Sequence, residues 1–259
     1  MAFMEVQFYS EVLKLEMAAY VLMPQPKDPE TSDKPYKTLW LYHGGSGDHT
    51  GWMRNSRIET YAQQRNIAVI MPGVHKSCFI NMNMGMRYGD FVGRELVDIM
   101  RGFFPRLSHR REDNFVSGLS NGGYGCIHVG LSNPDIYGAI GAFSAGDKAD
   151  VDFTNRQKEK QILFGDVDMP NSPYCLKYVG RQLIESGKTP PVVYHACGTE
   201  DPWLAQNNLM RDFFTSFPGD PFHYHYDLVE GYGHQWELWD MEIQKFLDYL
   251  GVTPKEREK

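Results

Sequence analysis

The sequence lacks the features that would place it in a disulfide-bonded, zinc-binding or membrane-spanning class. Its 259 residues include only four cysteines, and none of them forms a CxxC pair. Neither a disulfide framework nor a zinc knuckle is therefore expected, and reduced thiols are the default. No apolar run approaches the roughly 18 residues that a membrane span requires. The cysteines are Cys78, Cys126, Cys175 and Cys197.

Positive charge is also scarce. The net charge is −7, and the one basic run is His109-Arg110-Arg111. Nucleic acids and anionic membranes attract basic surfaces, so neither is an expected partner. The N-terminus carries Glu5 and Glu11 and has no basic leader, which argues against a signal peptide. These absences predict a cytoplasmic protein.

What the chain does contain is a regular alternation of short apolar runs and helical patterns. Residues 5–24 have the alternation of two antiparallel strands, and the later strands alternate with helices. This order predicts one α/β domain over residues 1–259, with a mostly parallel sheet covered on both faces. The later strands are expected at 38–42, 67–71, 114–117, 139–145, 192–198 and 223–229, and the helices at 91–105, 124–134, 174–186, 204–217 and 236–250.

Two stretches break this alternation. Residues 24–35 form a polar, proline-rich connection. Residues 146–173 are the least regular part of the chain, and their length predicts a cap or lid over the site.

The segment FVSGLSNGGYG, residues 115–125, contains four glycines around Ser120. It fits G-x-S-x-G, with an apolar strand before it and a helical pattern after it, as in a nucleophile elbow. Gly118 and Gly122 are expected because a β-carbon there would collide with the neighbouring strand and helix. The alternative is a hairpin turn at Asn121-Gly122, but the residues that follow have helical spacing.

A serine nucleophile needs a base and an acid that orients the base. In this arrangement both follow the serine, each just after a strand, in the order acid and then histidine. His234 in GYGHQW fits the base, whereas His195 and His128 fall within a strand and a helix. A metal pair of alternating histidines on the strand 223–229 lacks a nearby third ligand.

Asp201 follows the strand at 192–198, where open α/β sheets place their chemistry. Its neighbour Glu200 is the competing acid, and Asp201 could instead cap the helix that begins near Trp203. Asp166 and Asp168 have no clear strand before them.

An oxyanion site is expected in His43-Gly44-Gly45-Ser46-Gly47, which follows the strand at 38–42. Glycines there let backbone N–H groups approach a carbonyl oxygen, and the N–H of Asn121 would be the second donor. The alternative is a glycine-rich turn without a ligand. No phosphate-binding loop, dinucleotide fingerprint or HExxH motif is present.

Several of these stretches together resemble a known family. LYHGGSGDHTGWMR, VIMPG, FFPRLSHRREDNFVSGLSNGGYG, GTEDPW and GYGHQWELW are similar to the tributyrin esterase (acetyl esterase) branch of the esterase D-like α/β-hydrolases. Feruloyl esterases, acetylxylan esterases and S-formylglutathione hydrolases belong to the same broad family. The likeness is closest over residues 38–138.

The resemblance implies an α/β-hydrolase fold without a metal or organic cofactor. By motif, Ser120 is the nucleophile, Asp201 the orienting acid and His234 the base, with Gly45 and Asn121 as oxyanion donors. Trp52 would either line the acyl pocket or belong to the core.

The sequence departs from the family at two places. The elbow of this branch usually reads GLSMGG, whereas Asn121 stands here. S-formylglutathione hydrolases have SGLTCTEQN in the oxyanion loop where this chain has HGGSGDHTG. The second difference argues against a glutathione thioester as the main substrate.

We therefore expect a serine esterase that acts on small esters with short acyl groups, acetyl to butyryl, through an acyl-enzyme. The alternatives are a feruloyl or carbohydrate acetyl esterase, a serine peptidase, and a non-catalytic binding protein on a hydrolase scaffold. Homo-oligomerisation stays open at this stage.

Overall fold

The computed structural model describes residues 1–25 and 34–254. Most of the polar connection expected at residues 24–35 lies outside the described residues.

An eight-stranded sheet organises the chain, in the order β1-β2-β4-β3-β5-β6-β7-β8. Strands β1 and β2 pair with each other antiparallel, and β2 pairs antiparallel with β4. All the remaining pairs are parallel. The bounds are β1 Ala2–Ser10, β2 Leu15–Met23, β3 Thr38–Tyr42, β4 Ala68–Pro72, β5 Asn114–Leu119, β6 Ala139–Phe143, β7 Val192–Gly198 and β8 His225–Val229.

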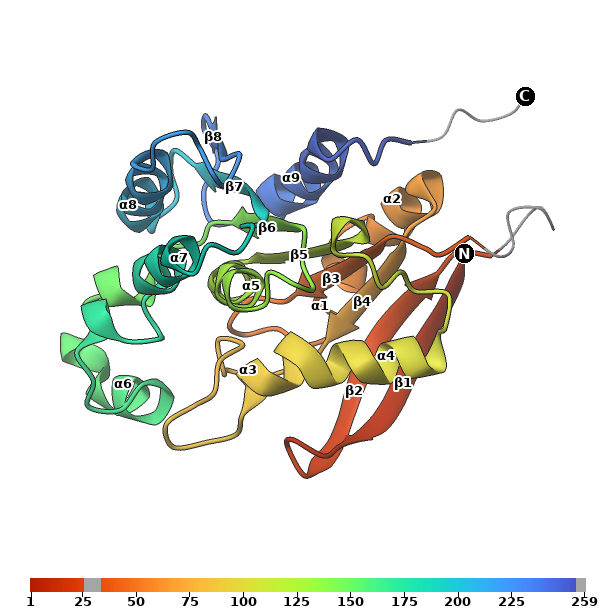
Figure 1. Ribbon diagram of the computed structural model, residues 1–259, viewed down its shortest axis with the longest axis horizontal. Helices are drawn as coiled ribbons and strands as arrows, with labels where there is room; N and C mark the ends of the chain where they lie inside the picture. The colour runs from red at the N-terminus through yellow and green to blue at the C-terminus, as the bar shows by residue number, and fades with distance from the viewer. Residues whose placement is uncertain (26–33, 255–259) are drawn as a thin grey trace.

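Helices cover both faces of this sheet (Figure 1). Side chains of α1, α2 and α9 form one buried cluster with the sheet, and side chains of α4, α5, α7 and α8 form the other. Every residue of β3, β4, β5 and β6 is buried, as expected for parallel strands covered on both sides. The bounds are α1 Gly51–Asn55, α2 Ile58–Arg65, α3 Tyr88–Asp90, α4 Leu96–Phe103, α5 Asn121–Ser132, α6 Gln157–Leu163, α7 Leu176–Glu185, α8 Leu204–Thr215 and α9 Trp236–Tyr249.

The architecture confirms the predicted α/β class, with its antiparallel N-terminal strands. The helix expected at 91–105 is interrupted, because residues Phe91–Glu95 form a π-helical turn between α3 and α4. Helices α1, α2 and α6 were not predicted. In α2 the buried residues include Arg65, whose guanidinium pairs with Asp248, so the apolar periodicity is weak.

The irregular stretch at 146–173 contains α6 and three short 3₁₀ turns. Figure 1 shows α6 at the edge of the molecule, away from the sheet. Backbone N–H groups of Asn83 and Met84 donate to the carbonyls of Leu163 and Ile162, both at 3.0 Å. These two bonds tie the end of α6 to the loop before α3. A lid role for this stretch stays a prediction.

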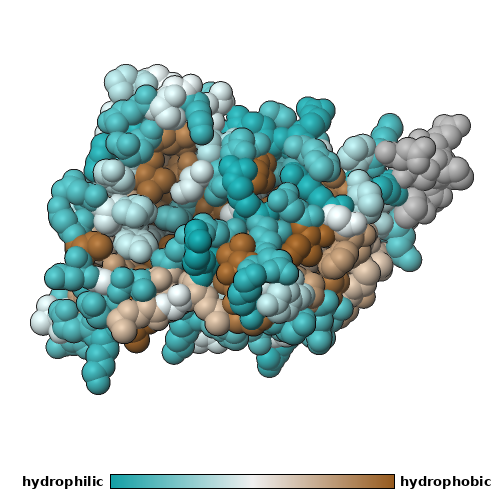
Figure 2. Space-filling model, turned by 60° about the horizontal axis from the view of Figure 1, so that its bottom comes forward, coloured by the Kyte–Doolittle hydropathy of each residue, from teal (hydrophilic) through white to brown (hydrophobic). Residues whose placement is uncertain are grey.

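On the face drawn in Figure 2, hydrophilic residues cover most of the surface and apolar residues gather in smaller patches. Across the described ranges, no helix has both the length and the apolar character needed to span a bilayer.

Candidate active site

Ser120 lies between the end of β5 and the start of α5. Its backbone has φ 55° and ψ −118°, in the left-handed half of conformational space that side chains rarely adopt. Its N–H donates to the carbonyl of Phe143, and its carbonyl accepts from Tyr124 in α5. The strand–turn–helix context of the elbow is confirmed, and the hairpin alternative is wrong because a helix follows.

The two glycines that flank the elbow explain how the backbone turns so sharply. A β-carbon on Gly118 would lie 2.5 Å from the carbonyl oxygen of Gly122. A β-carbon on Gly122 would lie 2.4 Å from the carbonyl oxygen of His43. Both clashes involve backbone, so a side chain at either position is excluded unless the chain moves, as the sequence predicted.

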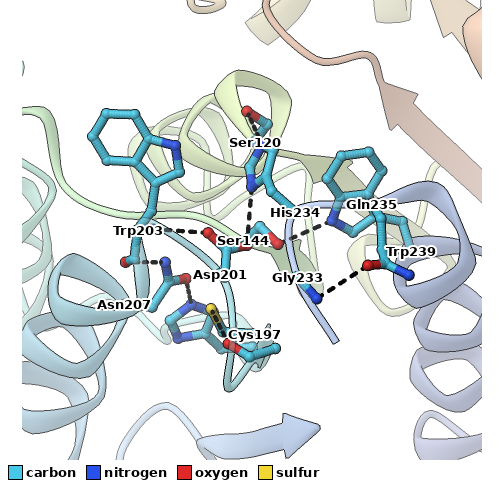
Figure 3. Close-up of polar contacts among 12 residues, drawn as sticks. Ser120, Ser144, Cys197, Asp201, Trp203, Asn207, Gly233, His234, Gln235 and Trp239 are labelled. Atoms are coloured by element: carbon cyan, nitrogen blue, oxygen red, sulfur yellow. Dashed lines mark hydrogen bonds and ion pairs between the residues drawn. The ribbon is translucent and has the colours of Figure 1, made fainter. Parts of the chain in front are cut away.

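Three residues from separate loops meet at this turn (Figure 3). His234 follows β8, and its Nε2 lies 3.0 Å from the Oγ of Ser120. Its Nδ1 lies 2.9 Å from the Oδ2 of Asp201, which follows β7. The hydroxyl can therefore donate to Nε2 while the Nδ1–H donates to the carboxylate, the tautomer that a general base requires.

The environment of Asp201 keeps its carboxylate charged, although its side chain is fully buried. Burial raises the pKa of this carboxyl, but hydrogen bonds from His234, from the backbone N–H of Trp203 and from Ser144 outweigh burial. The net pKa lies below the ordinary aspartate value. The bond from Trp203 lies in the turn before α8, which begins at Leu204 with Trp203 as its N-cap and without a side-chain cap. The alternative that Asp201 caps this helix is therefore wrong.

Ser144 and Trp239 complete this network, and sequence reasoning missed both. Ser144 follows β6, the strand between those that precede Ser120 and Asp201, and its φ is 52°. Its Oγ accepts from the indole Nε1 of Trp239 at 3.0 Å. The ring of Trp239 also packs edge-on against His234. The available sequence signal was its position. Ser144 directly follows the carboxyl end of a central parallel strand, the end of the strands at which Ser120 and Asp201 also lie.

The loop after β3 is held in place by His43. Its Nε2 accepts from the backbone N–H of Val74 at 3.1 Å, and its Nδ1 lies 2.7 Å from the carbonyl oxygen of Gly44. Burial lowers the pKa of His43, which keeps the ring neutral and able to accept. Gly45 lies against the side chain of Asn121, since a β-carbon on it would be 2.4 Å from the Asn121 Nδ2. The two expected oxyanion residues are therefore neighbours.

Asn121 departs from the usual elbow sequence, and its side chain has a specific partner. The Nζ of Lys148 donates to its Oδ1 at 2.7 Å. Lys148 belongs to the irregular stretch after β6, so this bond joins that stretch to the elbow. The backbone N–H of Asn121 is in the first turn of α5, where helix N–H groups have no partner within the helix.

Trp52 lies in the core. Its side chain is 1% exposed, its Nε1 donates to the carbonyl of Tyr42 at 2.9 Å, and its ring packs against Trp236. It lines neither of the two cavities beside the site, so the structure supports the core alternative for this residue.

Glu200, the competing acid, has an exposed side chain, and its backbone N–H donates to the carbonyl of Tyr232.

Two cavities meet at the elbow. The first, about 210 Å³, contains Ser120 and is bounded by the irregular stretch and the start of α8. The second, about 490 Å³, opens between the loop after β3 and α6, and includes Gly45 and Ser46. Asn121, Glu159 and Leu163 line both cavities. An ester bound across the elbow could place one half in each.

The chain combines a mostly parallel sheet covered by helices, a strained serine elbow, and an aspartate and a histidine after its last two strands. This is the architecture of an α/β-hydrolase of the serine type. The family model described as "Putative esterase" matches residues 10–249. The chain belongs to this esterase family and is a carboxylic ester hydrolase.

Individual relatives support the same assignment. An acetyl esterase of Caldicellulosiruptor saccharolyticus is 30% identical, over 96% of this chain and 98% of its own. The solved structure of FphF, a fluorophosphonate-binding serine hydrolase of Staphylococcus aureus, is 30% identical with a TM-score of 0.86, and the match covers 97% of this chain and 98% of that one.

The S-formylglutathione hydrolase FrmB of Staphylococcus aureus is 29% identical with a TM-score of 0.84, and the match covers 97% and 99% of the two chains. The resemblance to the acetyl esterase branch and its relatives is confirmed.

Proposed function

We propose that this esterase hydrolyses short-chain acyl esters, acetyl to butyryl, through an acyl-enzyme on Ser120. The observation that carries the proposal is the unbroken line of hydrogen-bonding distances from Asp201 through His234 to Ser120, 2.9 and 3.0 Å. A binding protein on a hydrolase scaffold would have no reason to keep this line intact.

In the proposed mechanism, the Oγ of Ser120 attacks the ester carbonyl while His234 Nε2 takes its proton. The negative charge that develops on the carbonyl oxygen is stabilised by the N–H groups of Gly45 and Asn121. Asp201 stabilises the imidazolium, which then protonates the departing alcohol. A water molecule attacks the acyl-enzyme by the same route, releasing the acid and restoring the serine.

Two observations support a small ester, and the first of them supports a short acyl group. The relative from Caldicellulosiruptor saccharolyticus is named an acetyl esterase. The cavity that contains Ser120 measures about 210 Å³, below the roughly 300–1,000 Å³ of pockets that bury drug-sized ligands. The expected partner is thus a small-molecule ester, with no cofactor required, and a cytoplasmic location stays a prediction.

A glutathione thioester is the second candidate, because a relative of nearly equal similarity is named an S-formylglutathione hydrolase. Against it stands the oxyanion loop HGGSGDHTG, which lacks the cysteine and the Glu-Gln pair of SGLTCTEQN. We therefore rank short oxygen esters first. Feruloyl esters rank lower, because the solved ferulic acid esterase is only 20% identical and supports the fold alone.

The test is a comparison of kcat/KM for 4-nitrophenyl acetate, butyrate and octanoate, methyl ferulate and S-formylglutathione, with Ser120→Ala in parallel. We expect acetate and butyrate to be the best substrates and all turnover to disappear in the variant. A clear preference for the thioester or for ferulate would replace the proposed substrate class. Turnover that survives in Ser120→Ala would refute the mechanism.

A further inference from the structure

The cavity that contains Ser120 has an unusual charge for this acidic protein. Its wall includes Lys148 and Arg156 but only one carboxylate, that of Glu159. The chain as a whole carries a net charge of −7. A locally positive wall beside the nucleophile is therefore a feature of this site and not of the surface in general.

Lys148 provides most of this unbalanced charge. The one hydrogen-bond partner of its ammonium group among the described residues is the neutral Oδ1 of Asn121, and no described carboxylate lies within ion-pairing distance of the Nζ. An ammonium group has three N–H donors, so two remain after the bond to Asn121. The side chain is half-buried and lies 5.5 Å from the centre of the Tyr124 ring.

Arg156 is only weakly neutralised. Its guanidinium lies 3.8 Å from a carboxylate oxygen of Glu159, and both side chains are more than a third exposed. A pair of this kind contributes little free energy. The guanidinium also lies over the rings of Phe153 and Trp203, at 5.0 and 6.0 Å, which hold it at the cavity wall.

One hydrogen-bond acceptor in the wall has no partner in the described part of the chain. The Oε1 of Gln206 is buried and has no hydrogen-bond partner among the described residues. A buried amide oxygen without a partner is costly unless a ligand or water supplies a donor. This oxygen is an acceptor, so it needs an N–H or O–H donor and would not bind a carboxylate itself. The donors that the wall offers to an anion are those of Lys148 and Arg156, on a cavity that opens at Ser120.

From this arrangement we propose that the cavity binds an anionic ester, and that Lys148 and Arg156 bind a carboxylate on the half of the ester that enters it. Two cations and one anion leave a single positive charge, which matches a carboxylate better than a phosphate group of nearly two negative charges. This inference rests on the proposed function, since it names the substrate class of the same site.

Two matched pairs of esters test it. Monoethyl succinate and ethyl butyrate share the leaving alcohol and the chain length, and differ by a carboxylate on the acyl side. 3-Acetoxybenzoate and 3-acetoxybenzamide share the acetyl group and have one ester each, and they differ by a carboxylate on the alcohol side. Hydrolysis is monitored by pH-stat titration. The quantity compared is the ratio of kcat/KM for the charged ester to kcat/KM for the neutral ester. Taking this ratio within each variant cancels changes in the shared chemistry.

We expect the ratio of one pair to fall about tenfold or more in Lys148→Met, the usual worth of a hydrogen bond to a charged group. Arg156→Gln should lower the same ratio. Glu159→Gln should raise it, because it removes the one negative charge from the wall. Lys158→Met, an equal loss of charge on an exposed position of α6 that lines neither cavity, should leave the ratio unchanged.

Ratios that stay the same in all three cavity variants for both pairs would overturn the proposal. If Lys148→Met does not fold, Arg156→Gln and Glu159→Gln decide it by their opposite signs. Ser120-dependent hydrolysis of the neutral esters in the same experiment shows whether the proposed function stands. The failure of the anion site and the failure of the esterase mechanism are therefore distinguished.

Discussion

The indole Nε1 of Trp239 donates to the Oγ of Ser144 at 3.0 Å. This bond directs the serine hydroxyl, which hydrogen-bonds the carboxylate of Asp201. Asp201, which orients His234, is thus itself positioned by Ser144 at the end of β6 and, through Ser144, by Trp239 of α9. Two further positions therefore contribute to the site without contacting the ester carbonyl in the proposed mechanism.

Replacing Ser144 with alanine should lower kcat about tenfold, because a charged acceptor loses one of its hydrogen bonds. Trp239→Phe, which keeps the ring against His234 but removes the N–H, should lower it less. Steady-state kinetics on 4-nitrophenyl acetate measure both effects. Ser117→Ala is the control, since it removes another buried hydroxyl, bonded to the Gly141 carbonyl. Equal kcat values in Ser144→Ala and Ser117→Ala would rule out the positioning role.

Asp201→Asn should reduce kcat on the order of 10⁴-fold, because the amide favours the wrong tautomer of His234 while leaving the geometry nearly intact. Glu200→Gln is the matched control, since it makes the same change at the neighbouring exposed acid. We expect it to retain the activity of the parent. A large loss in Glu200→Gln with a small one in Asp201→Asn would reverse the assignment of the acid.

Gly122→Ala should destabilise the fold strongly, since the new β-carbon would lie within 3 Å of the backbone oxygens of both Tyr42 and His43. Overpacking of this kind costs roughly 1–3 kcal/mol or more. Gly102→Ala in α4, where a β-carbon meets nothing within 4 Å, should instead stabilise by about 0.5–1 kcal/mol. Urea unfolding of the two variants checks the opposite signs. Equal stabilities would mean that the elbow backbone can relax.

Because His195 is buried, we expect the free energy of unfolding to fall on acidification. Burial lowers the pKa of its ring from the ordinary 6.5 to about 4, although hydrogen bonds oppose the shift. Between these two values the unfolded chain binds a proton that the folded chain does not, so the free energy of unfolding falls as the pH falls. The loss of unfolding free energy from this residue begins as the pH falls below 6.5 and reaches about 3 kcal/mol near pH 4.

Urea unfolding of the protein at several pH values between 6.5 and 4 should show this slope, and His195→Asn should make it shallower. Buried His43 and half-buried His128 also have lowered pKa values and act in the same direction, so some slope will remain. His109→Asn, at an exposed position, is the control and should leave the slope as it is. A slope unaffected by His195→Asn would contradict the neutral, buried state of the ring.

Local sequence predicted the elbow and its partners well, because their signals are local. Gly118 and Gly122 stand in one short motif between a strand and a helix, and Asp201 and His234 each follow a strand. The bonds of Ser144 to Trp239 and Asp201 join residues far apart in the sequence, and no local pattern encodes them. The same holds for Lys148, whose bond to Asn121 depends on how an irregular stretch folds over the sheet edge.

Trp52 shows the opposite difficulty. It stands next to the oxyanion loop in sequence, but α1 turns its ring into the core between the sheet and α9. Proximity in sequence to a functional loop therefore did not indicate proximity to the cavity.

In the proposed mechanism Ser120 carries the acyl group, and mass spectrometry of the quenched reaction tests this directly. The protein is mixed with 4-nitrophenyl acetate, stopped by acid within the first turnover, and digested. We expect one added acetyl group on the peptide that contains Ser120, and none on the same peptide of Ser120→Ala. Acetyl on another residue, or turnover without any acetylated peptide, would contradict the mechanism.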